Sequence, residues 1–229
     1  MTLEINQVYC GDCLDLMKEI PDKSIDLVLT DPPYGIGEDG RKGVRTSPSR
    51  PNSYKRPPKH DALGWDDTCP DQTHFDELFR ISRNQIIFGA NHFISKIPFD
   101  SSCWIVWDKN NVGTDFADCE LAWTSFKTAT RKFFGHKFIG LRGGKDCVHP
   151  TQKPLKLMEW CLLKYSQPGD TILDPFLGSG TTAVACVKTG RNYIGIEKEP
   201  KYVEIALKRL EKVNNHKLTD FSILPGVEV

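Results

Sequence analysis

The sequence predicts an α/β fold, in which a single mixed sheet carries helices on both faces. Two stretches predict it. Residues 7–31 contain a strand, a helix and a second strand, and residues 171–197 contain a strand, a glycine-rich turn, a helix and another strand. Units of this kind join parallel strands through right-handed crossovers. The chain has 229 residues, which is enough for a buried core, and we expect one domain over residues 1–229.

Each element is expected where a run of apolar or β-branched residues is bounded by turn residues. In chain order, strands are expected at residues 7–10, 25–30, 85–89, 103–108, 120–124, 171–176 and 192–197. Helices are expected at 13–19, 73–82 and 155–165, from the glycine turn to about 189, and at 201–213. Residues 214–229 are expected to form a tail.

The strand at 25–30 runs directly into Asp31-Pro32-Pro33-Tyr34. Two prolines cannot continue a ladder, so this is a stiff turn at the carboxyl end of a strand, where open α/β sheets bind ligands. The Asp31 carboxylate and the Pro32 carbonyl are two acceptors for the N–H bonds of an exocyclic amine. Holding both N–H bonds draws the nitrogen toward tetrahedral geometry, while the Tyr34 ring stacks on the base. The alternative is an ordinary turn with a surface Asp31 and a packed Tyr34.

The second strand–turn–helix unit carries a nucleotide-binding pattern. Gly178 and Gly180 allow close backbone approach, and Glu197 ends the next strand, where it can bind ribose hydroxyls. The spacing also fits the loose dinucleotide fingerprint, so an NAD-dependent oxidoreductase is an alternative. Asp174 argues against it, because a carboxylate there repels a pyrophosphate. The same carboxylate attracts the ammonium and sulfonium groups of S-adenosylmethionine.

Charge is balanced over the whole chain, with 30 basic and 30 acidic residues, but it is segregated along the sequence. Residues 35–63 hold seven Lys/Arg against three Asp/Glu and are expected to form a basic flexible loop. Residues 121–145 hold six Lys/Arg and no acid, and are interleaved with Phe126, Phe133, Phe134 and Phe138. Both segments fit a nucleic-acid surface. The alternatives are a solvated insertion and a two-stranded ribbon with core aromatics. The DNA-binding candidates, chosen because no acid nearby competes for them, are Arg131, Lys132, Lys137 and Arg142.

Targeting and metal signals are weak. No apolar run reaches the roughly 18 residues of a membrane span, and residues 1–6 lack the basic and apolar blocks of a signal peptide. We therefore expect a cytoplasmic protein without membrane contact. Cys10 and Cys13 form the only CxxC pair, with no second pair to complete a zinc site, so no metal is expected.

Taken together, the motifs resemble the amino-methyltransferases that modify adenine N6 or cytosine N4 in DNA. Residues 31–34 resemble their catalytic motif and residues 174–182, DPFLGSGTT, their cofactor loop. Residues 151–154 and 11–13 resemble two further blocks, so the resemblance spans nearly the whole chain. The catalytic block comes first, which is the circularly permuted order of the beta group. The resemblance implies a Rossmann-like methyltransferase fold in which the strands at 25–30 and 171–176 are central neighbours.

The resemblance also implies S-adenosylmethionine as cofactor and assigns roles. Asp174 faces the methionyl amine, Glu197 the ribose and Asp12 the adenine, with Thr151 and Lys153 near the methionyl end. The catalytic candidates are Asp31, Pro32, Pro33 and Tyr34. The full set of cofactor-binding candidates is Asp12, Cys13, Thr151, Lys153, Asp174, Phe176, Gly178, Ser179, Gly180, Thr181, Thr182 and Glu197.

Aspartate at position 31 suits adenine, whereas the cytosine enzymes more often carry serine there. The resemblance thus implies methylation of adenine N6 in double-stranded DNA by a bacterial or phage-encoded enzyme, on a base flipped out of the helix. Cytosine N4, an RNA adenine and a non-catalytic nucleic-acid-binding relic are the alternatives. A homodimer and a separate cognate restriction endonuclease are compatible partners. The segment expected to recognise the target, residues 124–148, is short, which predicts a short or degenerate target.

Overall fold

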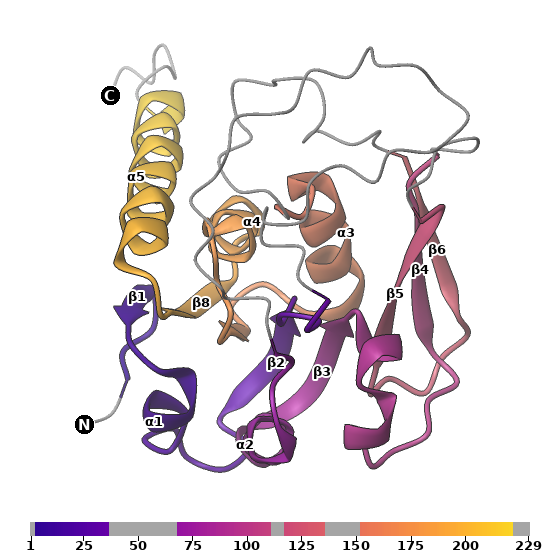
Figure 1. The fold of residues 1–229 in the computed structure, drawn as a ribbon. Helices are drawn as coiled ribbons and strands as arrows, with labels where there is room; N and C mark the ends of the chain where they lie inside the picture. The colour runs from indigo at the N-terminus through magenta and orange to yellow at the C-terminus, as the bar shows by residue number, and fades with distance from the viewer. Residues whose placement is uncertain (1–2, 37–67, 111–116, 136–151, 222–229) are drawn as a thin grey trace, which may run out of the picture.

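The computed structural model describes residues 3–36, 68–110, 117–135 and 152–221, and these form one eight-stranded sheet covered by helices (Figure 1). From one edge to the other, the strands are β1 (Gln7–Cys10), β8 (Asn192–Glu197), β7 (Thr171–Asp174), β2 (Ile25–Thr30), β3 (Ser82–Phe88), β5 (Cys119–Thr124), β4 (Trp104–Asp108) and β6 (Arg131–Phe134).

The sheet is mixed, as the sequence predicts. The five strands from β1 to β3 are parallel, β5 is antiparallel to both β3 and β4, and β6 is parallel to β4. The catalytic strand β2 lies directly beside the cofactor strand β7, with Leu27 opposite Ile172 and Val28 opposite Leu173. The expectation that these two strands are central neighbours is confirmed. Their carboxyl ends therefore share one crevice.

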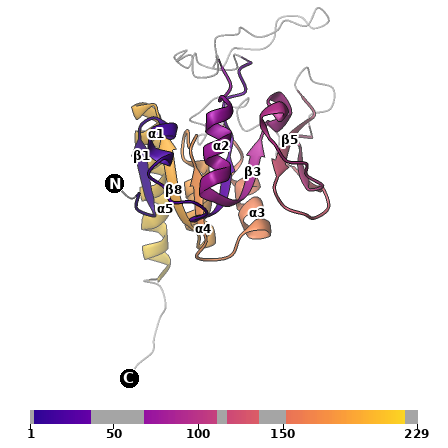
Figure 2. The same cartoon turned by 90° about the horizontal axis from the view of Figure 1, so that it is seen from below.

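Helices cover both faces of the sheet (Figure 2). Side chains of β2 alternate between two cores: Leu27 and Leu29 pack in one, and Val28 packs in the other. This alternation is the period of two that a strand imposes on its side chains. The Val28 face carries α1 (Cys13–Met17), α2 (Gln72–Ile81) and the 3₁₀ turns η1 (Ala90–His92) and η2 (Ile94–Lys96), and the other face carries α3 (Leu155–Tyr165), α4 (Thr181–Thr189) and α5 (Pro200–Phe221).

Most element ends lie within three residues of the expected ones; β3, for example, begins at Ser82 and not at residue 85. Three further differences stand out. Strand β6, η1 and η2 were not expected, because their sequences (RKFF, ANH and ISK) are short and are not apolar runs. Strand β7 ends at Asp174 and not at residue 176, since Pro175 cannot donate to a ladder. Helix α5 continues to Phe221, so the expected tail is wrong for residues 214–221, where the sequence holds no glycine or proline to stop a helix.

Parts of two expected segments lie outside the described residues. They are residues 37–63 of the basic loop and residues 136–148 of the target-recognition segment. Within the described part of the chain, no helix is long and apolar enough to cross a membrane.

Candidate functional site

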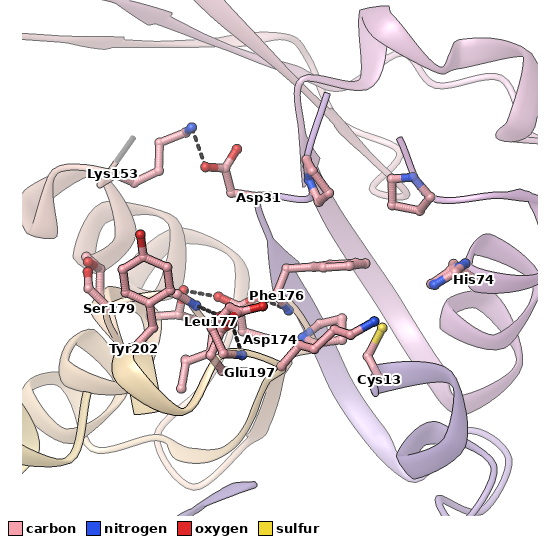
Figure 3. A pocket seen from close by; sticks show the side chains of 18 of the residues that line it. Cys13, Asp31, His74, Lys153, Asp174, Phe176, Leu177, Ser179, Glu197 and Tyr202 are labelled. Carbon is pink, nitrogen blue, oxygen red and sulfur yellow. Dashed lines mark hydrogen bonds and ion pairs between the residues drawn. The ribbon is translucent and has the colours of Figure 1, made fainter. Parts of the chain in front are cut away.

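A pocket of about 710 Å³ lies at the carboxyl ends of the parallel strands. Asp31 follows β2, Asp174 ends β7 and Glu197 ends β8, and all three line this pocket (Figure 3). These residues are far apart in sequence and meet because parallel strands present their carboxyl ends at one edge of the sheet. The location is the one that the sequence predicts for a ligand.

Asp174 is the most buried carboxylate of the pocket, at 4% exposure. It accepts hydrogen bonds from the Thr30 hydroxyl at 2.8 Å and from the Thr182 hydroxyl at 2.6 Å. Burial raises the pKa of Asp174 to about 6, and the two hydroxyl donors oppose that rise. The described surroundings give this carboxylate hydroxyl and amide donors but no ammonium or guanidinium partner. An acceptor of this kind suits a cationic ligand group, because pairing relieves the cost of a buried charge.

Glu197 is held by the backbone. Its Oε2 accepts the Gly178 N–H at 2.7 Å, and its Oε1 accepts the Glu199 N–H at 2.8 Å. Burial raises the pKa of Glu197, and these backbone donors oppose the shift. The carboxylate is thus fixed beside the glycine turn with lone pairs left for hydroxyl donors, which fits a ribose.

The glycine turn lines the pocket through Gly178, Ser179, Thr181 and Thr182, but not through Gly180. Gly180 has a φ of 84°, and a Cβ there would stand 2.7 Å from the Cβ of Ala206 in α5. A contact between Gly180 and the cofactor stays a prediction. The contribution of Gly180 is the close approach of the α4 N-terminus to α5. Arg209, also in α5, donates to the Ser179 carbonyl at 2.6 Å and braces the turn.

The N-terminal unit contributes Asp12 and Cys13 to the same pocket. Asp12 caps α1 by accepting the Leu14 N–H at 2.9 Å. Burial raises the pKa of the Cys13 thiol to about 12, so this cysteine lines the wall as an unreactive thiol. Phe176, another candidate, also lines the pocket, and its ring centroid lies 6.2 Å from that of His74 in α2.

The pocket residues that were missed from the sequence include His74, Gln152 and Tyr202. Gln152 stands inside the block at residues 151–154 and was identifiable from it; its side-chain oxygen accepts from the Ser179 hydroxyl at 3.2 Å. His74 and Tyr202 belong to no motif, and the tertiary structure alone brings them to the pocket. Thr151, a cofactor candidate, lies outside the described residues.

At the catalytic turn, both Asp31 oxygens are engaged. Oδ1 accepts the Tyr34 hydroxyl at 2.6 Å, and Oδ2 pairs with the Lys153 ammonium at 2.5 Å. Burial raises the pKa of Asp31, and the Lys153 ammonium opposes that rise. Lys153 was expected near the methionyl end of a cofactor; it does line the pocket, but its ammonium contacts Asp31 (Figure 3). Asp31 and Pro33 line the pocket, whereas Pro32 is buried and Tyr34 lies outside the lining.

The Tyr34 ring is packed more closely than a solvent-facing stacking platform. It stacks on His92 of η1, with centroids 4.9 Å apart and planes 13° apart. It also lies against Gly89, whose φ is 67°, and a Cβ at that glycine would stand 2.0 Å from Tyr34 Cε1. The left-handed glycine is therefore required for this position of the ring.

Replacing Gly89 with alanine is expected to displace the Tyr34 ring and leave the cofactor pocket intact, since Gly89 is not among its lining residues. On the expectation that the Tyr34 ring stacks on the target base, we expect Gly89→Ala to weaken capture of that base by about 1–3 kcal/mol, the scale of base–aromatic stacking. DNA binding and methyl transfer measured beside S-adenosylhomocysteine calorimetry will check this. Gly190→Ala is the matched control, because Gly190 also has a positive φ, 74°, but nothing lies within 4 Å of its Cβ position. Equal activity in the two variants will contradict a role of the Tyr34 ring in binding the target base.

The basic candidates are only partly described. Arg131 is exposed on β6, but Lys132 pairs with Asp108 at 2.7 Å, so the expectation that no acid competes for it is wrong. The reason is the sheet: β6 lies beside β4 and brings Asp108 alongside. Phe126 packs on Tyr165 and Phe133 on Trp160, so these aromatics belong to the core, whereas Phe134 is 67% exposed. Lys137 and Arg142 lie outside the described residues.

The site can be compared with known proteins. A family model described as DNA methylase, of the N6/N4 type, matches residues 44–208. The type II methyltransferase M.HinfI of Haemophilus influenzae is 30% identical over 268 aligned residues, covering 96% of this chain and 74% of that protein. The type II methyltransferase M2.MboI of Moraxella bovis is 28% identical over 242 residues, covering 90% and 88%.

One solved structure is similar to this chain over nearly the whole length of the solved protein. The crystal structure of M1.HpyAVI in complex with S-adenosylmethionine superposes with a TM-score of 0.58 and 28% identity, covering 89% of this chain and 98% of that one. This relative shares the fold and was solved with S-adenosylmethionine bound. In this chain the pocket contains two carboxylates, Asp174 and Glu197, whose chemistry suits that ligand. The chain therefore belongs to the N6/N4 DNA methylase family and is an S-adenosylmethionine-dependent DNA methyltransferase.

Proposed function

We propose that this enzyme methylates N6 of adenine in duplex DNA. The observation that carries the proposal is the position of Asp31: it follows β2, and the neighbouring strand β7 ends in the cofactor-pocket residue Asp174. A carboxylate acceptor thus faces the same pocket as the carboxylate that suits the cofactor ammonium. The sequence supports adenine, because position 31 is aspartate and not the serine that is more frequent in cytosine enzymes.

The residues of the pocket fit the cofactor by their chemistry. Asp174 is a buried acceptor for the methionyl ammonium, and the backbone-held Glu197 is an acceptor for ribose hydroxyls. The cofactor supplies an electrophilic methyl group on its sulfonium. Asp31 and the Pro32 carbonyl accept the two N–H bonds of the target amine, which localises the nitrogen lone pair. A base reaches this pocket only after it leaves the stack, at a cost of a few kcal/mol.

The basic side chains at residues 131–142 are candidates for binding the DNA backbone. We propose that the exposed Arg131 contacts a phosphate, and that Lys137 and Arg142 do so as well. Lys132 contributes less, because Asp108 already neutralises it. Asp31, Asp174 and Glu197 all come from one chain and line one pocket.

The base is identified by nucleoside analysis. Wild-type protein is incubated with isotopically labelled S-adenosylmethionine and with duplexes containing only A·T or only G·C pairs, and the digested nucleosides are resolved by mass spectrometry. We expect label in N6-methyldeoxyadenosine. Label in N4-methyldeoxycytidine contradicts the choice of base, and preferential labelling of an RNA of the same sequence contradicts the choice of duplex DNA. The Asp31→Asn variant, purified in the same way, is the control for methyl transfer by contaminating methylases.

A further inference from the structure

Four charged side chains of alternating sign meet beside the catalytic turn. Asp31 pairs with Lys153, whose ammonium also lies 3.1 Å from Glu120 Oε2, and Glu120 Oε1 pairs with Lys109. Glu120 is in β5 and Lys109 follows β4, so the antiparallel part of the sheet delivers this end of the network. Asp31 and Lys153 line the pocket, whereas Glu120 stands behind them and is not among the described residues that line it.

The network couples the ionisation of Asp31, Glu120 and Lys153. Burial raises the pKa of Asp31, and Lys153 opposes that rise. Burial acts in the same direction on Glu120, but the ammonium groups of Lys153 and Lys109 together bring its pKa below the ordinary value. The pKa of Lys153 lies well above its ordinary value despite burial, because Asp31 and Glu120 both stabilise the cation. Each charge therefore depends on its neighbours of opposite sign.

This arrangement creates a conflict for methyl transfer. Each oxygen of Asp31 already accepts from one partner, Tyr34 or Lys153, so the target amine must compete with the short Lys153 contact when it brings its own N–H to that carboxylate. Lys153 has only 6% of its side chain exposed. Releasing its ammonium without another acceptor leaves an unpaired buried charge, which is strongly unfavourable.

Glu120 resolves the conflict. Its Oε2 is buried, lies 3.1 Å from the Lys153 ammonium, and accepts no hydrogen bond of good geometry within the described residues. We propose that Glu120 is a positioning residue that takes up the Lys153 ammonium when the target amine reaches Asp31. Resting on the proposed methylation of an exocyclic amine, this assigns Glu120 a role in the reaction although it stands behind the pocket wall. The cation moves from one carboxylate to the other and stays paired throughout.

The test is Glu120→Gln, which keeps the shape of the side chain and removes its charge. S-adenosylhomocysteine should bind within about twofold of wild type, while kcat falls by about tenfold or more because Lys153 stays on Asp31. The Glu120 charge raises the pKa of Asp31, so its removal should also move the acid limb of the kcat–pH profile to lower pH. If Glu120 acts only in folding, its substitution lowers the amount of active enzyme but does not change the pH at which the acid limb of the kcat–pH profile falls.

Glu159→Gln is the matched control. Glu159 in α3 is likewise a buried carboxylate contacted by two lysines, Lys156 at 2.8 Å and Lys188 at 3.6 Å, but it does not line the pocket. Its substitution should lower the melting temperature and leave kcat and its pH limb unchanged. If Glu120→Gln does not fold, Glu120→Asp decides: the retained charge should keep the limb at the wild-type pH, and the carboxylate, shorter by one methylene, should still lower kcat.

Three results overturn the proposal: a wild-type kcat in Glu120→Gln, an unmoved acid limb in that variant, or a wild-type kcat in Glu120→Asp. Failure of the proposed function is seen separately, in the identity of the methylated nucleoside made by the wild-type enzyme. The two failures are therefore distinguishable.

Discussion

Asp31→Asn is expected to reduce methyl transfer by about a hundredfold or more while cofactor binding stays nearly unchanged. Asparagine retains the size of the side chain and an acceptor for the Tyr34 hydroxyl, which now donates at 2.6 Å. It lacks the charge that stabilises the amine as positive charge develops on the nitrogen. The cofactor carboxylates Asp174 and Glu197 are not altered. Single-turnover transfer and S-adenosylhomocysteine calorimetry measure the two effects on the same preparation.

Asparagine is a better choice than alanine at this position. Both substitutions remove the charge that Asp31 presents to Lys153, but alanine also removes the oxygen acceptor, which leaves the Tyr34 hydroxyl and the buried ammonium without a hydrogen-bond partner at this position. A loss of activity in Asp31→Ala therefore mixes catalysis with folding. If Asp31→Asn keeps more than about a tenth of the wild-type kcat, the carboxylate is not engaged in the transition state.

Asp174→Asn is expected to weaken S-adenosylhomocysteine binding by about thirtyfold or more, since it removes one partner of a buried charge pair.

The same substitution should raise the free energy of unfolding of the ligand-free protein. The folded-state pKa of Asp174 is about 6, above its ordinary value of 3.8, because burial disfavours the charged form. The carboxylate therefore costs stability on the order of 3 kcal/mol once the pH exceeds 6, and asparagine avoids that cost.

The sign of the pH dependence follows from the raised pKa. The neutral form of Asp174 is the one that the folded protein favours. Its contribution to the free energy of unfolding is fully present below pH 3.8 and is lost as the pH rises through about 6. The melting temperature of Asp174→Asn should thus exceed that of wild type by several degrees at pH 8, and the gap should close toward pH 4. A gap that is equal at both pH values, or a variant that still binds the ligand normally, rules out this account of Asp174.

Local sequence determines a large part of the site. Asp31, Asp174 and Glu197 each follow or end a short apolar run, and a strand in a parallel sheet presents such a residue at its carboxyl end. Asp12 caps a helix that its own sequence marks. These residues were predictable because their placement depends on dihedral angles and hydrophobic periods within about ten residues of chain.

The tertiary structure determined which charged side chains form ion pairs. Lys153 meets Glu120 only because β5 packs antiparallel on β3, and β3 lies next to the catalytic strand β2. Lys132 is neutralised by Asp108 only because β6 pairs with β4. Strand order is set by the free energy of the whole core and not by any one segment, so the sequence by itself determined which groups stand at the strand ends, and only the folded sheet determined which charges they meet.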